Sequence, residues 1–296
     1  MRTLLDQHDA LVLDGGLATR LEELGCDLSD ELWSARLLMD DPDLIRRAHR
    51  DFFAAGADVA TTASYQASVP ALIRRGMSVR EAADLIRRSV TLAAEARDER
   101  GAGLVAASVG PYGAYLANGA EYTGAYDLDE EGLAAWHRDR WHILADSGAD
   151  LLACETIPSY PEARALARLL AETPGVRAWM SFSCRDGEHI NDGARLSDCA
   201  ALFSGLDAVV AVGANCTAPR YIPSLIREAA TSGAAVVVYP NSGETWDAER
   251  RGWTGSSDPV RFGAEARGWR AAGARLIGGC CRTTPEHIRQ IRAHLG

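Results

Sequence analysis

The chain has 296 residues, of which 47% are hydrophobic, and its formal net charge is −10. A chain of this length and composition can bury a large core, either as one α/β barrel or as two ordinary domains. The acidic balance, without a dense basic stripe, argues against nucleic acid as a partner.

The sequence favours a cytoplasmic location. The first nine residues lack the apolar core of a secretory signal peptide, and no apolar run approaches the ~20 residues of a membrane span. Seven cysteines are an odd number, which favours reduced thiols and metal binding over a disulfide framework. We therefore expect no membrane partner. The sequence does not fix the oligomeric state.

A strand–helix unit recurs along the chain. The segments that are expected to form strands lie at 11–16, 58–62, 104–109, 150–155, 177–184, 208–213, 234–239 and 275–278. The segments that are expected to form long helices lie at 42–55, 79–100, 129–147, 159–172, 196–204, 219–231, 258–272 and 285–295. Continuous apolar runs such as Val236-Val237-Val238 are typical of buried parallel strands.

Glycines mark the passage from a helix to the next strand. Such glycines, which end helices in the usual C′ position, are Gly56, Gly103, Gly148, Gly233 and Gly273. Eight strand–helix units in about this length predict an α/β fold, a (β/α)8 TIM barrel that forms a single domain over residues 1–296. A doubly wound open sheet is the weaker alternative.

Polar residues lie at the C-terminal ends of the expected strands, where such a barrel forms its active face. They are Asp14, Thr61, Glu155, Asn215, Cys216, Asn241, Cys280 and Cys281. Because they come from six different strands, we expect them to converge on one cavity.

Three cysteines are candidates for a metal site. Cys280 and Cys281 are adjacent, so a disulfide bond between them would be strained, and Cys216 follows another strand. Three thiolates with an open position predict a reactive zinc centre. Such a centre activates water poorly but can hold an incoming thiol as a thiolate, so the chemistry implied is attack by that thiolate on an electrophilic carbon. Glycines at 213, 278 and 279 are expected to free the backbone to turn the thiols inward.

Asp14 and Glu155 have two interpretations. They could be buried salt-bridge partners, or they could together bind a substrate ammonium group on the active face. The backbone N–H groups around Gly15 and Gly16 could bind a carboxylate at the start of the following helix. An amino acid that carries a thiol fits this set.

The chain resembles the homocysteine S-methyltransferases over nearly its full length. The segments that carry the resemblance are residues 14–16, 61–66, 108–114, 155–156, 213–216, 239–243 and 278–281. The Asn-Cys and Gly-Gly-Cys-Cys sequences at the ends of two strands are its most specific part. The Gly-Pro-Tyr-Gly-Ala-Tyr loop resembles the branch that uses S-methylmethionine and, to a lesser extent, S-adenosylmethionine.

The resemblance implies a zinc-dependent methyltransferase. Cys216, Cys280 and Cys281 would hold Zn²⁺, and homocysteine would supply the fourth ligand through its sulfur. Asp14 and Glu155 would hold its amino group. Further candidates for positioning it are Thr61, Tyr65, Gly15 and Gly16. The thiolate would attack the methyl group of a sulfonium donor in line and yield methionine.

The donor half of the site has only loop aromatics as candidates, since a sulfonium cation is attracted to aromatic faces. These are Tyr112, Tyr115, Tyr122, Trp33 and Trp246, and ordinary loop packing is the alternative for each.

Three other functions stay open. The first is a methyltransferase of the same fold that uses betaine or a related thiol or selenol acceptor. The second is a barrel lyase or hydrolase with a metal-bound water, for which His189 is the one histidine expected on the active face. The third is a thiol or metal-storage protein, which would not need the pair of Asp14 and Glu155.

Overall fold

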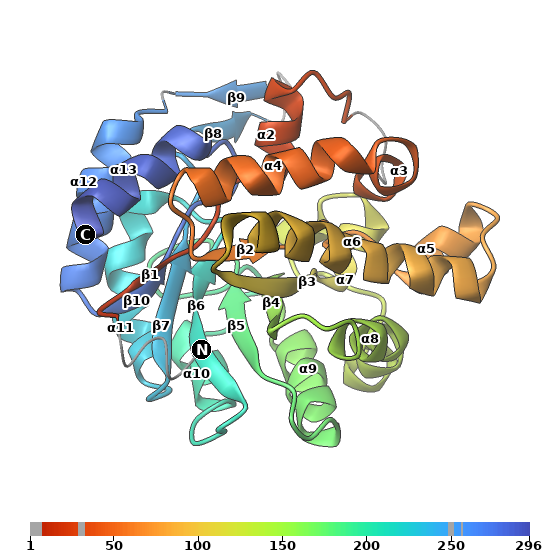
Figure 1. Ribbon diagram of the computed structural model, residues 1–296. Coiled ribbons are helices and arrows are strands. Elements are labelled where there is room, and N and C mark those ends of the chain that lie inside the picture. Colours follow the sequence, from red (N-terminus) through yellow and green to blue (C-terminus); the bar gives the residue numbers. More distant parts are fainter. Residues whose placement is uncertain (1–7, 29–32, 248–251, 256) are drawn as a thin grey trace.

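Eight parallel strands lie side by side in the computed structural model, which describes residues 8–28, 33–247, 252–255 and 257–296 (Figure 1). The strands are β1 (Leu11–Val12), β2 (Val59–Thr61), β3 (Leu104–Val109), β4 (Leu151–Ile157), β5 (Ala178–Phe182), β6 (Val209–Asn215), β7 (Ala235–Tyr239) and β10 (Ala274–Ile277). Their order in the sheet is β1-β10-β7-β6-β5-β4-β3-β2. A parallel bridge between Leu13 and Val59 joins the two outer strands. The predicted single-domain (β/α)8 barrel is confirmed.

Helices surround this sheet (Figure 1). Those that correspond to the expected helices are α4 (Pro42–Ala54), α6 (Val79–Arg100), α8 (Glu130–Ala145), α9 (Tyr160–Glu172), α10 (Leu196–Ala201), α11 (Ile222–Ala230), α12 (Pro259–Ala271) and α13 (Pro285–Leu295). The segment expected at 219–231 divides into the 3-10 helix η2 (Pro219–Tyr221) and α11.

The loops contain further elements. They are α2 (Leu17–Glu23), α3 (Trp33–Asp40), α5 (Val69–Arg74), α7 (Tyr112–Leu116), the 3-10 helix η1 (Ala120–Tyr122) and an antiparallel hairpin of β8 (Thr245–Asp247) and β9 (Gly252–Thr254). Of these, α5, α7, η1 and the hairpin were not expected from the sequence.

Local sequence explains where the helices begin and end. Ser78 and Glu81 form a reciprocal capping box at the start of α6, and Gly101 ends it with a left-handed φ of 82°. The five glycines that were expected to end helices all have positive φ, between 75° at Gly233 and 127° at Gly103, but α6 ends at Gly101 and Gly103 lies two residues beyond it. A side chain would be strained there, so glycine is required at these turns.

The core has an inner and an outer layer. The inner layer takes residues from all eight strands and comprises Leu11, Leu13, Val59, Ala106, Leu151, Ala153, Trp179, Val210, Ala211, Val237, Tyr239 and Leu276. The neighbouring strand residues, such as Val12 and Val238, belong to the outer layer between sheet and helices. This alternation fills the barrel with side chains, so a substrate can reach only its ends.

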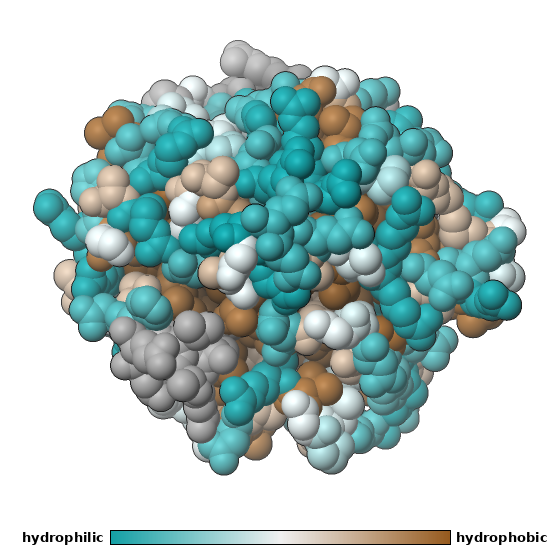
Figure 2. Space-filling view, viewed as in Figure 1, coloured by the Kyte–Doolittle hydropathy of each residue, from teal (hydrophilic) through white to brown (hydrophobic). Residues whose placement is uncertain are grey.

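Hydrophilic residues predominate on the face of the molecule shown in Figure 2. The large hydrophobic side chains that are exposed come from separate elements and are Met39, Ile73, Val79, Tyr122, Leu206 and Val260. Among the described helices, none has both the length and the apolar character needed to cross a bilayer.

Candidate active site

The three cysteines predicted to bind a metal meet at the C-terminal ends of β6 and β10. Their sulfur atoms all lie within 4.8 Å of one another. The sulfur atoms of Cys216 and Cys281 are 3.5 Å apart, which is too far for a disulfide bond, and all three thiols are free. A tetrahedral zinc ion with Zn–S distances of about 2.3 Å would hold its sulfur ligands about 3.8 Å apart. The cluster of Cys216, Cys280 and Cys281, called here the cysteine cluster, therefore fits such an ion.

An unusual backbone conformation presents one of these thiols. Cys216 has a φ of 49°, which is rare outside glycine. The glycines expected to turn the thiols inward instead allow close backbone packing, since none of them has a positive φ. A Cβ on Gly213 would lie 1.7 Å from the carbonyl oxygen of Val237, and one on Gly279 would lie 2.4 Å from Thr283 Oγ1. The expected role of these glycines was therefore wrong.

Neighbouring loops fix the Cys280-Cys281 backbone. Cys280 N–H donates to the carbonyl of Pro240 (2.8 Å), and Cys281 N–H donates to Asn241 Oδ1 (3.2 Å). Thr283 Oγ1 donates to the carbonyl of Cys280 (2.7 Å). The loop after β7 and the start of α13 thus hold the two thiols in place.

Asp14 and Glu155 are both buried, with 3% and 8% of their surfaces exposed. Asp14 accepts hydrogen bonds from Thr61 Oγ1 (2.5 Å) and Thr61 N–H (2.8 Å), and Glu155 accepts one from Ser108 Oγ (2.5 Å). Burial raises the pKa of Asp14 to about 8 and that of Glu155 to about 7, although these hydrogen bonds act in the opposite direction. The charge of Glu155 contributes to the raised pKa of Asp14, so the two carboxylates are near neighbours.

Within the described part of the chain, no cation neutralises this pair. Neither Asp14 nor Glu155 forms a salt bridge with any residue that the structure describes. Two buried carboxylates without a positive partner favour the protonated state, and a bound ammonium group would reverse this. The geometry favours substrate binding over the structural interpretation of these residues.

The two glycines after β1 differ in what they can offer a ligand. Gly16 N–H already donates to Thr283, at 3.0 Å to Oγ1 and 3.2 Å to the carbonyl oxygen. A Cβ on Gly16 would lie 2.6 Å from the carbonyl oxygen of Cys280. Gly16 therefore serves the packing of two loops, and Gly15 N–H is the better candidate for a carboxylate.

The tyrosines expected near the site fall into two groups. Tyr122 Oη lies 4.0 Å from Cys216 Sγ, and the charge of Cys216 contributes, after burial, to the raised pKa of Tyr65. Tyr112 and Tyr115 instead stack on each other and on Trp136 of α8, with ring centroids 5.1–5.7 Å apart. These two are packing residues.

Two of the aromatic candidates, Trp33 and Trp246, have side chains outside the described part of the structure. The histidine required by the hydrolase alternative, His189, is bound to Asp186 through Nδ1 (3.1 Å). Among the described residues, the cysteine cluster is the one group of three histidine, cysteine or acidic side chains that could hold a metal ion.

Sequence reasoning missed several residues that support the site. Ser108 begins a segment that carries the family resemblance, but it had no predicted role of its own, and Thr283 lies at a helix start without a functional signal. Asn215 was noted as a polar strand-end residue, but not as the side chain whose Nδ2 lies 4.0 Å from Cys280 Sγ. These contacts join residues from distant parts of the chain.

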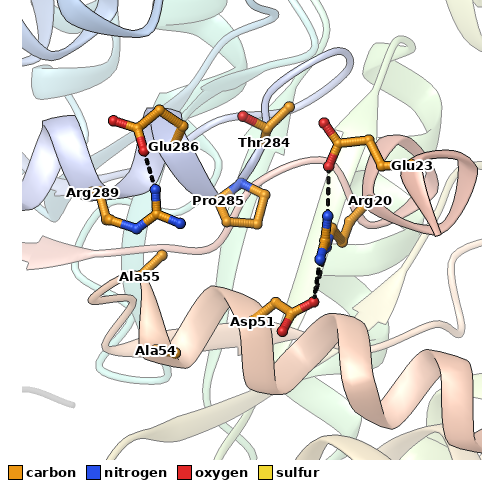
Figure 3. Close-up of a pocket in the computed structure, with 9 residues that line it drawn as sticks. All are labelled: Arg20, Glu23, Asp51, Ala54, Ala55, Thr284, Pro285, Glu286 and Arg289. Atoms are coloured by element: carbon orange, nitrogen blue, oxygen red, sulfur yellow. Dashed lines mark hydrogen bonds and ion pairs between the residues drawn. The ribbon is translucent and has the colours of Figure 1, made fainter.

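A cavity of about 310 Å³ lies elsewhere, among α2, α4 and the start of α13 (Figure 3). Arg20 in its wall binds Asp51 and Glu23, and Arg289 binds Glu286 (Figure 3). Because both arginines are already neutralised and no thiol lines it, this cavity is not a candidate active site.

Comparisons with known proteins agree with this geometry. Residues 11–295 match the family described as homocysteine S-methyltransferase. A homocysteine S-methyltransferase of Bacillus subtilis is 50% identical, with 98% of this chain and 96% of the relative covered. A selenocysteine Se-methyltransferase of Brassica oleracea is 43% identical, with coverages of 96% and 88%. Crystal structures of a homocysteine methyltransferase of Escherichia coli in oxidized and metallated forms have TM-scores of 0.90 and 0.86, 46% identity and coverages of 99% and 98%.

Proposed function

The chain belongs to the homocysteine S-methyltransferase family, and on this basis we propose that it transfers a methyl group from a sulfonium donor to homocysteine and forms methionine. S-methylmethionine is the first candidate donor and S-adenosylmethionine the second. The observation that carries the proposal is the position of two buried carboxylates, Asp14 and Glu155, beside three free thiols, with no cation among the described residues to pair with them. An amino acid with a thiol supplies what both groups lack.

We propose that the metal is zinc and that Cys216, Cys280 and Cys281 hold it. The sulfur spacing fits this ion, and a relative of known structure exists in a metallated form. When bound, zinc would lower the pKa of the substrate thiol and supply it as a thiolate near neutral pH.

The chain's own residues orient the acceptor. Asp14 and Glu155 would bind its ammonium group, and Thr61 keeps Asp14 in place through two hydrogen bonds. Gly15 N–H would bind its carboxylate, with Tyr65 at the side of the site. Holding the amino-acid end at two points directs the thiolate lone pair at the donor methyl carbon.

The transfer balances in charge. A new S–CH₃ bond forms from the thiolate lone pair while the donor C–S bond breaks, and its electron pair stays on the departing sulfur. Donor cation and acceptor anion become two neutral thioethers. With S-methylmethionine as donor, both products are methionine.

A second acceptor class is favoured by one observation. A relative with 43% identity is named as a selenocysteine Se-methyltransferase, and a selenol would occupy the same site as a thiol.

We propose small amino acids and sulfonium donors as the partners of the whole barrel, residues 1–296. Betaine as donor, and the expected cytoplasmic location, stay predictions.

A methionine-formation assay tests the function. Homocysteine or selenocysteine would be incubated with S-methylmethionine, S-adenosylmethionine or betaine, and methylated product would be measured by mass spectrometry. We expect methionine from homocysteine and S-methylmethionine. No methylated product with any pair would refute the proposed function.

A further inference from the structure

The short helix η1 brings a carboxylate to the edge of the cysteine cluster. It comprises Ala120–Tyr122, and Tyr122 Oη is 4.0 Å from Cys216 Sγ. Glu121 is the residue next to this tyrosine. Its charge contributes to the raised pKa of Tyr122 and of Tyr65, so it lies near the place where methyl transfer is proposed, and the acceptor half of the site does not use it.

Two other segments hold the backbone of Glu121. Its carbonyl oxygen accepts hydrogen bonds from Ser183 Oγ (3.3 Å) and Asn191 Nδ2 (3.5 Å). Gly113 packs so closely that a Cβ there would lie 2.3 Å from Glu121 N. The position of the Glu121 backbone is thus set by contacts from the loop after β5 and from α7, so this part of the site is formed before a ligand binds.

One oxygen of the half-buried Glu121 carboxylate lacks a hydrogen-bond partner. Its Oε2 is buried and has no hydrogen-bond partner, and the described part of the chain offers it no salt bridge. Burial raises the pKa of this carboxyl, and only the Glu121 backbone N–H acts against this. A buried carboxylate oxygen without a partner is costly, so a bound cation would remove a penalty that the empty protein carries.

Three tyrosines lie around this charge. Burial raises the pKa of Tyr65 and Tyr126, and the charge of Cys216 raises that of Tyr122. In all three the negative charge of Glu121 acts in the same direction. Tyr126 Oη also accepts the N–H of Gly113 (3.2 Å), the residue packed against Glu121. A sulfonium cation has no N–H to donate, so it depends on negative charge and on the faces of aromatic rings for binding.

We propose that Glu121, together with Tyr65, Tyr122 and Tyr126, binds the positively charged sulfur of the methyl donor. This inference rests on the proposed function and names the donor half of the same site. The donor's positive charge disappears when its C–S bond breaks and the electron pair stays on the departing sulfur. A site built around a carboxylate therefore binds the cationic donor more tightly than the neutral thioether product, which favours product release.

The variant that tests this is Glu121→Gln, which keeps the shape and removes the charge. We expect the KM for S-methylmethionine to rise by at least about tenfold, since one desolvated charge contact is worth that much in affinity. The KM for homocysteine and the metal content should stay within about twofold of the parent. Glu121→Asp, which restores the charge on a shorter side chain, should recover part of the loss. Glu188→Gln, an exposed acid in the loop after β5, is the control for net charge.

An uncharged methyl donor separates this role from a structural one. Methyl iodide can methylate the bound thiol without presenting a cation, so its rate should be the same in the parent and in Glu121→Gln. An equal loss of rate with methyl iodide and with S-methylmethionine would overturn the inference. So would a donor KM that is the same in Glu121→Gln and in the parent, provided that the parent is active.

Binding can be measured without turnover. Saturation-transfer NMR with trimethylsulfonium should show binding to the parent protein and a loss of the signal in Glu121→Gln. If the parent binds trimethylsulfonium, loses this binding in Glu121→Gln and yet forms no methionine, the proposed function is refuted and this inference stands. Equal signals in parent and variant would refute the inference whatever the activity.

Discussion

The side-chain amide of Asn215 forms hydrogen bonds with the backbone N–H and the hydroxyl group of Thr156. Its Oδ1 accepts from Thr156 N–H (2.8 Å), and its Nδ2 donates to Thr156 Oγ1 (2.8 Å). Thr156 has a φ of 61°, which costs a β-branched residue on the order of 1–3 kcal/mol. Thr156 directly follows Glu155, so this contact sets the direction in which the Glu155 side chain leaves β4.

The same amide also contacts a residue of β5 and a residue in the segment after β10. Asn215 Oδ1 also accepts from Ser181 Oγ (2.8 Å), and Nδ2 lies 4.0 Å from Cys280 Sγ. Asn215 therefore connects the strand that carries Glu155 to the cysteine cluster, and we treat it as a positioning residue.

Asn215→Ala should destabilise the protein by about 1–3 kcal/mol, because it leaves Thr156 N–H buried without a partner. It should also raise the KM for homocysteine more than that for the donor. Thr156→Gly in the same chain should recover part of the stability, since glycine adopts this φ without strain. Urea unfolding of both single variants and the double variant measures this coupling. Additive effects would contradict it.

Removal of the metal is expected to abolish activity and leave the barrel folded, because the large apolar core does not depend on the cysteine cluster. Metal analysis should find about one zinc ion per chain. Cys280→Ser should lose most of this zinc and at least about 100-fold in methionine formation. Cys26→Ser, a thiol in a loop outside the cluster, is the matched control. Full activity of a metal-free protein would show that zinc has no part in the reaction.

The barrel could be predicted because its signals are local and repeated. Apolar runs such as that of β7, and the glycines between a helix and the next strand, need no knowledge of the rest of the chain. The helix α5 has six residues, too few for helical periodicity to show. The segment of α7, Tyr112–Leu116, has a loop-like composition, and its helix is held by the packing of Tyr112 on Trp136.

The site was predictable only as far as topology determines it. The ends of parallel strands converge, so Asp14, Glu155 and the cysteines could be placed together. The contact between Ser108 and Glu155 joins residues 47 positions apart and has no local pattern. The left-handed backbone of Cys216 is held by tertiary contacts and is equally invisible in the sequence, where the neighbouring glycines seemed the better explanation of the turn.

Binding of the product methionine should strengthen as pH rises from 6 to 8. In the empty protein the pKa values of Asp14 and Glu155 are raised to about 8 and about 7, and an ammonium group binds only their ionised forms. The ionised population grows with pH, while methionine has no thiol to add its own titration. We expect roughly tenfold or more tighter binding at pH 8 than at pH 6, from calorimetry.

Asp14→Asn is the variant for this measurement. It should weaken methionine binding at pH 8, flatten the dependence on pH and leave the zinc content unchanged. A parent protein with a flat profile would contradict the assignment of the two carboxylates, and equal losses of methionine and zinc would contradict the separate role of Asp14.

A buried network of charged residues behind the site should stabilise the protein as well as hold the neighbouring loops in position. The guanidinium of Arg140 is 2% exposed and donates to the carbonyls of Tyr65 (3.2 Å) and Gly110 (2.5 Å). Glu162 accepts from His137 Nε2 (2.8 Å) and from the N–H of Tyr112 (2.6 Å), and Arg140 contacts His137 Nδ1. The network thus ties α8 and α9 to the loops after β2 and β3.

Arg140→Met keeps the bulk of the side chain and leaves the two carbonyls and the Glu162 charge uncompensated. Breaking a buried ionic network in this way should cost about 3–5 kcal/mol in the free energy of unfolding. Arg168→Met removes exposed ion pairs with Glu131 and Glu172, and should lower the free energy of unfolding far less, because solvent screens such pairs. Since Arg140 holds the backbone of Tyr65, its variant should also raise the donor KM at temperatures where the protein stays folded. Similar costs for the two variants would show that the network contributes no more than a surface salt bridge.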